Sequence, residues 1–179
     1  FTGKPKHSQV TGVQCKGGSE DVTIEKCQFA SAGQRPINAG GSTGRDYFRP
    51  LDAKYEARRV IIRGNEISGS QCACAFVGVD GAEFTGNTIR LPEKWVFRIL
   101  QADTTEGFGP GRNVAIAGNT ITFRRSQVSS EINVGPHTEP ESFRFAKNRW
   151  LAEDRPDRSK PSLPTPEKEG TYGDPKDTR

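Results

Sequence analysis

The chain has 179 residues, with 26 Lys and Arg against 22 Asp and Glu, a formal net charge of +4, 20 Gly, 12 Pro and no Met. No apolar run approaches the roughly 18 to 20 residues of a spanning helix, and the glycines follow no three-residue period, which excludes an integral membrane helix and collagen. The hydrophobic fraction of 32% is low for a core. One domain followed by a solvated tail would explain this value.

The first ten residues, FTGKPKHSQV, are polar and begin without Met. We expect residues 1–10 to be a lead-in that continues a missing upstream segment, from which any signal peptide has been removed. They carry His7, one of the two histidines in the chain.

Internal repetition dominates the middle of the chain. Five octets superpose without gaps and share an apolar alternation, a corner and a final apolar residue. The corner carries Asn65, Asn87, Asn119 and Asn148 in four octets and Cys27 in the first. This pattern predicts two strands that meet at a bend. The octets are VTIEKCQF (22–29), VIIRGNEI (60–67), AEFTGNTI (82–89), VAIAGNTI (114–121) and FRFAKNRW (143–150).

A third extended piece follows each of the first four bends, at 36–39, 73–79, 95–101 and 131–134, with a leading copy at 13–16. Three short strands per turn predict a solenoid of parallel strands, about five coils over residues 11–151. We expect the Asn side chains to stack as a hydrogen-bonded ladder at the corner. The predicted inward residues are Val22, Ile24, Phe29, Val60, Ile62, Ile67, Ala82, Phe84, Ile89, Val114, Ile116, Ile121, Phe143, Phe145 and Trp150.

Motifs such as VIIRGNEISGS and VAIAGNTITF resemble the coil repeats of right-handed parallel β-helix proteins, the architecture of pectate lyases, polygalacturonases and phage tailspikes. The phrases AGQRPINAGGSTG, AFVGVDGAEFTGNTI and WVFRILQAD are similar to uncharacterised secreted β-helix proteins of planctomycete-type bacteria. The resemblance implies an all-β fold and a secreted, periplasmic or cell-surface bacterial protein. A sandwich or jelly roll is the competing all-β interpretation, and it would require antiparallel hairpins with two-residue turns.

Residues 152–179 contain five prolines among charges of both signs. Such a segment buries too little surface to offset its chain entropy. We expect an extended or disordered tail, or a capping strap that Leu163 and Tyr172 lay along the body. A binding motif in this tail is a further alternative.

In the lyase branch, the resemblance implies a basic residue that removes the proton beside a uronate carboxylate, while Ca²⁺ or another cation neutralises that carboxylate. Alternation on the third strands predicts six outward side chains. Lys16, Arg35 and Arg98 would then line a basic stripe across successive coils, and they are the candidate catalytic residues. The alternative is a solvated face on which Arg98 pairs with Glu131. The predicted outward residues are Gln14, Lys16, Asn38, Arg98, Glu131 and Asn133.

In the polygalacturonase branch, the resemblance would imply carboxylates clustered on neighbouring coils, together with Gly-His-Gly and Arg-Ile-Lys motifs. The chain has neither motif, since Leu100 follows Arg98 and Ile99.

Loop residues supply further candidates, because the insertion 41–59 offers aromatic and cationic side chains for sugar rings and carboxylates. Packing of Tyr47 and Phe48 on the body is the alternative. The candidate substrate-binding residues are Asn38, Tyr47, Arg49, Asp80, Asn133 and His137.

The four cysteines, Cys15, Cys27, Cys72 and Cys74, allow buried free thiols, disulfides or a metal site. One residue separates Cys72 from Cys74, so both would lie on the same face of a strand. In the knuckles of structural zinc sites, two residues separate the paired cysteines. Cys15 and Cys27 fall at inward positions, where a free thiol behaves as a small hydrophobe. No metal site is therefore assigned, and Ca²⁺ is the one cofactor that the resemblance allows.

Two functions compete. The first is a β-helix that binds an acidic polysaccharide and cleaves it as a polysaccharide lyase or glycoside hydrolase. The second is a non-catalytic structural or adhesion module of a larger surface or secreted protein, with further coils or another subunit at its uncapped N-terminal end. A net charge of +4 is too modest to indicate DNA binding, and no aromatic-basic interleaving indicates single-stranded nucleic acid. We expect no membrane insertion.

Overall fold

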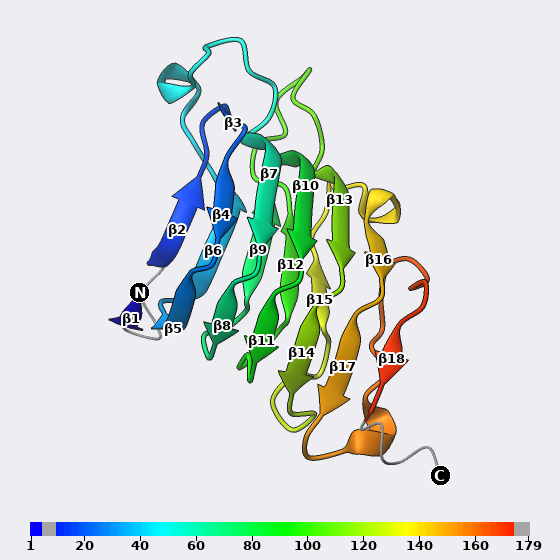
Figure 1. Cartoon of the computed structure of the whole chain (residues 1–179). Coiled ribbons are helices and arrows are strands. Elements are labelled where there is room, and N and C mark those ends of the chain that lie inside the picture. Colours follow the sequence, from blue (N-terminus) through cyan, green and yellow to red (C-terminus); the bar gives the residue numbers. More distant parts are fainter. Residues whose placement is uncertain (5–9, 174–179) are drawn as a thin grey trace.

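The computed structural model describes residues 1–4 and 10–173 (Figure 1). In these residues the chain forms short strands and three single-turn 3₁₀ helices, η1 (Arg45–Tyr47), η2 (Pro140–Ser142) and η3 (Pro156–Arg158). No helix in this part is long and apolar enough to span a membrane. The strands assemble into three sheets of seven, six and five strands.

The seven-stranded sheet has the order β1 (Thr2–Lys4), β5 (Gln28–Ala32), β8 (Glu66–Ser68), β11 (Thr88–Arg90), β14 (Thr120–Phe123), β17 (Arg149–Ala152) and β18 (Thr171–Tyr172). The six-stranded sheet runs β16 (Arg144–Ala146), β13 (Arg112–Ala117), β10 (Val79–Thr85), β7 (Ala57–Arg63) and β3 (Ser19–Glu20), and β4 (Thr23–Glu25) also pairs with β7. The five-stranded sheet contains β15 (Ile132–Val134), β12 (Phe97–Leu100), β9 (Cys74–Val77), β6 (Arg35–Gly40) and β2 (Thr11–Cys15).

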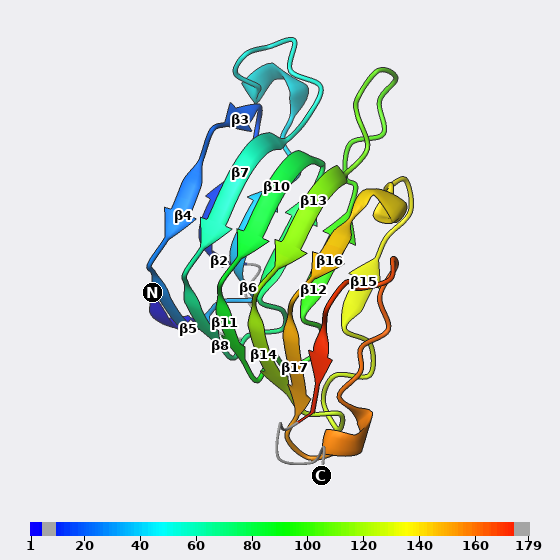
Figure 2. The same cartoon turned by 45° about the vertical axis from the view of Figure 1, so that its right-hand side comes forward.

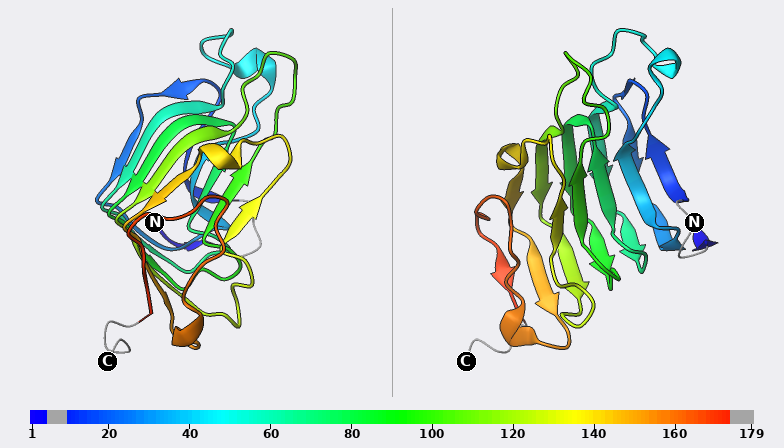
Figure 3. Two further views of the ribbon diagram at one scale, coloured as in Figure 1. Left: turned by 90° about the vertical axis from the view of Figure 1, so that its right-hand side faces the viewer. Right: turned by 180° about the vertical axis from the view of Figure 1, so that it is seen from behind.

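The chain visits the six-, seven- and five-stranded sheets in rotation, as in β7, β8 and β9 and then β10, β11 and β12. We call one such circuit a coil. Within residues 1–4 and 10–173, all strand pairs are parallel, including β7 with β10 and β9 with β12. Seen nearly along the stack, the strands of each sheet lie behind one another (Figure 3, left). The predicted all-β fold of stacked parallel strands is confirmed, and the antiparallel sandwich is excluded.

The core lies between the three sheets and follows the predicted inward columns. All of the inward residues are buried except Val22, which is half-buried and packs against the core at the first coil. Aromatic side chains meet edge to face within it, as Phe84 does with Phe97 at 5.1 Å between ring centroids.

The predicted asparagine ladder is present at the corner between the six- and seven-stranded sheets. The side-chain Nδ2 of Asn65 donates to Oδ1 of Asn87 at 3.0 Å, Asn87 donates to Asn119 at 3.1 Å, and Asn119 donates to Asn148 at 2.8 Å. The backbone N–H of each donor residue bonds to the same oxygen as its side chain. Cys27, which starts the ladder, donates its backbone N–H to Asn65 Oδ1 at 3.0 Å.

The C-terminal segment ends the ladder. Glu167 Oε1 accepts from the backbone N and the Nδ2 of Asn148, at 3.1 and 2.7 Å, and its Oε2 accepts from Nε1 of Trp150 at 2.9 Å. Strand β18 adds to the edge of β17, and Leu163 packs against the core. Residues 153–173 are therefore placed as a strap over the last coil, the arrangement that Figure 1 shows at its right-hand side.

Glu167→Ala should destabilise the protein by about 2 kcal/mol or more, because it leaves buried donors of Asn148 and Trp150 without an acceptor. Urea unfolding followed by circular dichroism measures this loss. Glu169→Ala is the matched control, since the Glu169 side chain is exposed and, within the described residues, forms one ion pair, with Lys147 at 3.6 Å. Equal stability of the two variants would show that Glu167 does not cap the ladder.

Candidate functional site

The outer face of the five-stranded sheet carries a row of side chains in strand register. Gln14 pairs with Asn38, Asn38 with Ala75, Ala75 with Arg98, and Arg98 with Asn133. Adjacent strands lie about 4.8 Å apart, so the row crosses the sheet at a regular spacing. Ala75 is the one small side chain in it, and it is buried between Asn38 and Arg98 in a cluster with Cys72 and Val77.

A groove of about 420 Å³ lies on this face. Polar side chains line it, including Lys16, Arg35 and Asn38, while Val77 and Leu100 form an apolar floor. The backbone comes close together here: Gly40 has φ +88°, and a Cβ at this position would lie 1.8 Å from the carbonyl oxygen of Val77. Gly40 therefore permits the close approach of β6 to β9 beneath the groove.

Arg98 is oriented by two neighbours. Its guanidinium lies over the Trp95 ring at 4.6 Å, and its Nε donates to Asn133 Oδ1 at 2.9 Å. Lys94 packs against the same ring at 4.3 Å. Burial of the Arg98 guanidinium and the nearby charge of Arg35 lower the pKa of Arg98.

The expectation that Arg98 pairs with Glu131 is wrong. Glu131 is 1% exposed, pairs with Arg125 and accepts the backbone N–H of Ser162 at 3.1 Å. Arg125 and the C-terminal strap thus cover this carboxylate. Within residues 1–4 and 10–173, no ion pair involves Lys16, Arg35 or Arg98. The three cations keep their charge available to a ligand.

Asn38 also differs from the expectation of an exposed outward side chain, as it is only 2% exposed. Its Nδ2 donates to the carbonyl of Gly40 at 3.1 Å, and its Oδ1 accepts from Nη1 of Arg35 at 3.5 Å. Asn38 therefore holds Arg35 at the groove.

The other predicted binding residues lie elsewhere. Tyr47 and Arg49 belong to the long loop 41–56, which Figures 1 and 2 show beside the loop 101–111. The loops are joined by an ion pair of 3.4 Å between Arg45 and Asp103, and Arg45 lies over Phe48 at 4.6 Å. Tyr47 is 77% exposed, whereas Phe48 is buried in a separate cluster with Ala53 and Tyr55 of its own loop and Phe108 of the loop 101–111.

The remaining candidates are tied to their own surroundings. Arg49 Nη1 donates to the carbonyls of Asp46 and Phe48 at 3.1 and 2.6 Å. Asp80 lies on the six-stranded sheet, where it accepts from Arg112 at 2.9 Å, and this pairing lowers its pKa. His137 is exposed and lines a separate hollow of about 340 Å³ beside the loop 101–111. The structure therefore gathers Lys16, Arg35, Asn38, Arg98 and Asn133 on one face, apart from Tyr47, Arg49, Asp80 and His137.

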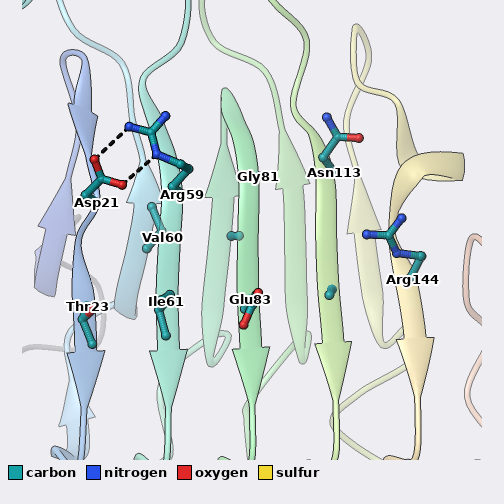
Figure 4. A pocket seen from close by; sticks show the side chains of 11 residues that line it. Asp21, Thr23, Arg59, Val60, Ile61, Gly81, Glu83, Asn113 and Arg144 are labelled. Carbon is teal, nitrogen blue, oxygen red and sulfur yellow. Dashed lines mark hydrogen bonds and ion pairs between the residues drawn. The ribbon is translucent and has the colours of Figure 1, made fainter.

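The sequence did not point to a second groove, of about 590 Å³, on the outer face of the six-stranded sheet (Figure 4). Its central row follows the repeat, however. Thr23, Ile61, Glu83, Ala115 and Arg144 are each the second residue of an octet, and strand pairing places them in register. The outward positions of the octets could have located this second groove from the sequence.

All four cysteines are free thiols. The expectation that Cys72 and Cys74 share one face is wrong: Cys74 lies in the core, whereas Cys72 packs outside the sheet with Ala75 and Val77. The chain turns the corner into β9 between them. Burial raises the pKa of Cys15 and Cys74 and raises that of Cys72 to about 12. In the described ranges, no group of three or more His, Cys, Asp or Glu side chains is placed to hold a metal ion.

Comparison with family models, with curated proteins and with solved structures gave no significant match. The fold itself defines the chain as an all-β protein of three stacked parallel sheets, consistent with a parallel β-solenoid.

The buried thiols should resist alkylation. At about pH 8, iodoacetamide should leave Cys15, Cys72 and Cys74 unmodified in the native protein, because burial suppresses the reactive thiolate. In denaturant, without any reductant, all four cysteines should be modified. Intact-mass analysis distinguishes these states, and cysteines that react only after reduction would mean that a disulfide is present.

Proposed function

We propose that the chain is a right-handed parallel β-helix of the pectate-lyase type, about five coils long, that binds an acidic polysaccharide on the outer face of its five-stranded sheet. The observation that carries this proposal is a set of three cations on this face: Lys16 and Arg35 line the groove, and Arg98 lies in the outward row of the same sheet. None of them pairs with a carboxylate in the described ranges. A protein of this function would be secreted, periplasmic or on the bacterial cell surface.

A comparison of faces supports this assignment. On the six-stranded sheet, Arg58, Arg59, Arg63 and Arg112 each pair with an acidic side chain. On the five-stranded sheet the cations instead flank a floor of Val77 and Leu100. Charge-assisted hydrogen bonds from these cations would hold the carboxylates of a polyuronate, while the apolar floor would contact the faces of its sugar rings.

Arg98 is the group best suited to act as a base. A lowered pKa enlarges the neutral fraction of its guanidinium at a given pH. The neutral group would take the proton beside the uronate carboxylate, a C=C bond would form, and the glycosidic oxygen would leave and receive a proton. Arg35 and Lys16 would neutralise the carboxylate, a task that Ca²⁺ bound together with the substrate would share.

A structural or adhesion module is the second candidate function. At the N-terminal end, Val13, Val22 and Cys27 are only partly buried, and β2 is the last strand of its sheet in the described ranges. Further coils or another subunit would cover this end and pair with its strand edges. A module of this kind would bind at its end and need no chemistry in the groove.

Arg35→Gln and Arg98→Gln should each weaken the binding of polygalacturonate about tenfold or more, since each removes a charge-assisted hydrogen bond. Isothermal titration calorimetry at low salt measures this change. Arg90→Gln is the matched control, because Arg90 is exposed on the seven-stranded sheet and its loss changes the net charge equally. If no polyuronate or sulfated glycan binds the unmodified protein, the proposal is wrong.

If Arg98 is the base, incubation with polygalacturonate or alginate should give an unsaturated product with a new absorbance in the short ultraviolet. The rate should rise with pH over the alkaline range, because the neutral guanidine is the reactive form. Arg98→Gln should abolish the product even at saturating glycan concentration, because a carboxamide cannot take the proton. Binding without any absorbance change would identify a binding module.

A further inference from the structure

The second groove, on the six-stranded sheet, is built by a bend that recurs in neighbouring strands. Arg59, Gly81 and Asn113 have φ values of 51°, 88° and 59°. The strand pairing passes over these residues: Asp80 pairs with Arg58, and the next pair is Ala82 with Val60. Each partner strand skips one residue, so the register is kept, and the left-handed backbone of the skipped residues bends the strands at this level. Because the bends lie side by side, they hollow the sheet along its stack, as Figure 4 shows.

The upper wall of this groove is fixed by hydrogen bonds. Arg59 donates from Nε and Nη2 to the carboxylate of Asp21 at 2.7 and 2.8 Å. Asn113 Nδ2 donates to Asp80 at 2.8 Å, and within residues 1–4 and 10–173 its amide oxygen accepts no hydrogen bond. The floor is apolar, formed by Ile61, Ala115 and the backbone of Gly81.

Glu83 and Arg144 stand on the lower side of the groove and are exposed. Ala115 lies between them in register, which separates their strands by about 10 Å. Neither side chain forms an ion pair within residues 1–4 and 10–173. The middle of the row is therefore an acceptor, Glu83, and its last member is a donor, Arg144, with the apolar Ala115 between them.

The charges lining this groove cancel. Asp21 and Glu83 balance Arg59 and Arg144, whereas the groove on the five-stranded sheet carries Lys16 and Arg35 with no acidic side chain. A polyanion would meet Glu83 and a polycation would meet Arg144. The complementary ligand is uncharged, offers both hydrogen-bond donors and acceptors, and has an apolar surface.

We propose that this groove binds a neutral oligosaccharide. Sugar hydroxyls both donate and accept, so they can bond to the Glu83 carboxylate and to the Arg144 guanidinium. The apolar face of one pyranose ring would lie on Ala115 and that of the next ring on Ile61, on either side of Glu83. The amide oxygen of Asn113 would accept from a further hydroxyl. The volume of about 590 Å³ lies within the range of ligand sites. The site is on a different sheet from the groove proposed for acidic glycans and does not depend on that function.

The test is affinity electrophoresis of the full chain through gels that contain soluble neutral polysaccharides: galactomannan, xyloglucan, arabinan, galactan and β-glucan. At least one should retard the protein. Glu83→Ala and Ala115→Leu should each weaken the retardation about tenfold, the first by removing an acceptor and the second by filling the floor. Glu66→Ala is the matched control, since Glu66 is an exposed carboxylate on the neighbouring seven-stranded sheet, and it should bind as the unmodified protein does.

Circular dichroism and the thermal midpoint establish that each variant is folded. Retardation that Glu83→Ala abolishes and Arg98→Gln preserves supports a separate neutral-glycan site. The proposal is overturned if none of the five polysaccharides retards the protein. It is equally overturned if retardation survives Glu83→Ala and Ala115→Leu, or is lost in Arg98→Gln.

Discussion

The asparagine ladder is the interaction on which the rest of the structure depends. Asn87, Asn119 and Asn148 each accept, on one oxygen, both the backbone and the side-chain N–H of the Asn one coil earlier. An unpaired donor at these positions costs about 1–3 kcal/mol, so a coil that slipped by one residue would lose two such bonds at once. The ladder therefore sets the coil-to-coil register of the two sheets that meet at its corner.

The ladder also has a direction and two different ends. It starts at Cys27, whose side chain has no amide oxygen that could accept from an earlier coil. It stops at Glu167, whose carboxylate accepts from Asn148 but cannot donate onward. The strap that carries Glu167 also covers Glu131. The same segment thus closes the stack and removes a carboxylate from the face on which the cations lie.

Both proposed binding surfaces follow from this register. When coils are aligned residue by residue, the outward positions of successive strands form rows, and the character of a row depends on which residues the sequence places there. On the five-stranded sheet the row contains Asn38, Arg98 and Asn133. On the six-stranded sheet it contains Ile61, Glu83 and Ala115.

The repeat was sufficient to predict the parallel strands, the inward columns and the ladder, because a period of two and a recurring Asn are local signals. It could not predict the partner of Arg98, because Glu131 is covered by Arg125 and by Ser162 from the distant strap. Asn38 faces outward as alternation requires, yet it is buried by its bonds to Arg35 and Gly40. A single Glu in a charge-rich tail has no sequence signature, so the role of Glu167 was visible only in the structure.

The central functional claim is that the unpaired cations of the five-stranded sheet hold an acidic glycan. A crystal structure of the protein with a short oligogalacturonate tests it most directly. The account predicts sugar carboxylates within hydrogen-bonding distance of the guanidinium groups of Arg35 and Arg98, with the rings above Val77 and Leu100. An oligogalacturonate bound on another sheet, or at the N-terminal end with the groove empty, would contradict it.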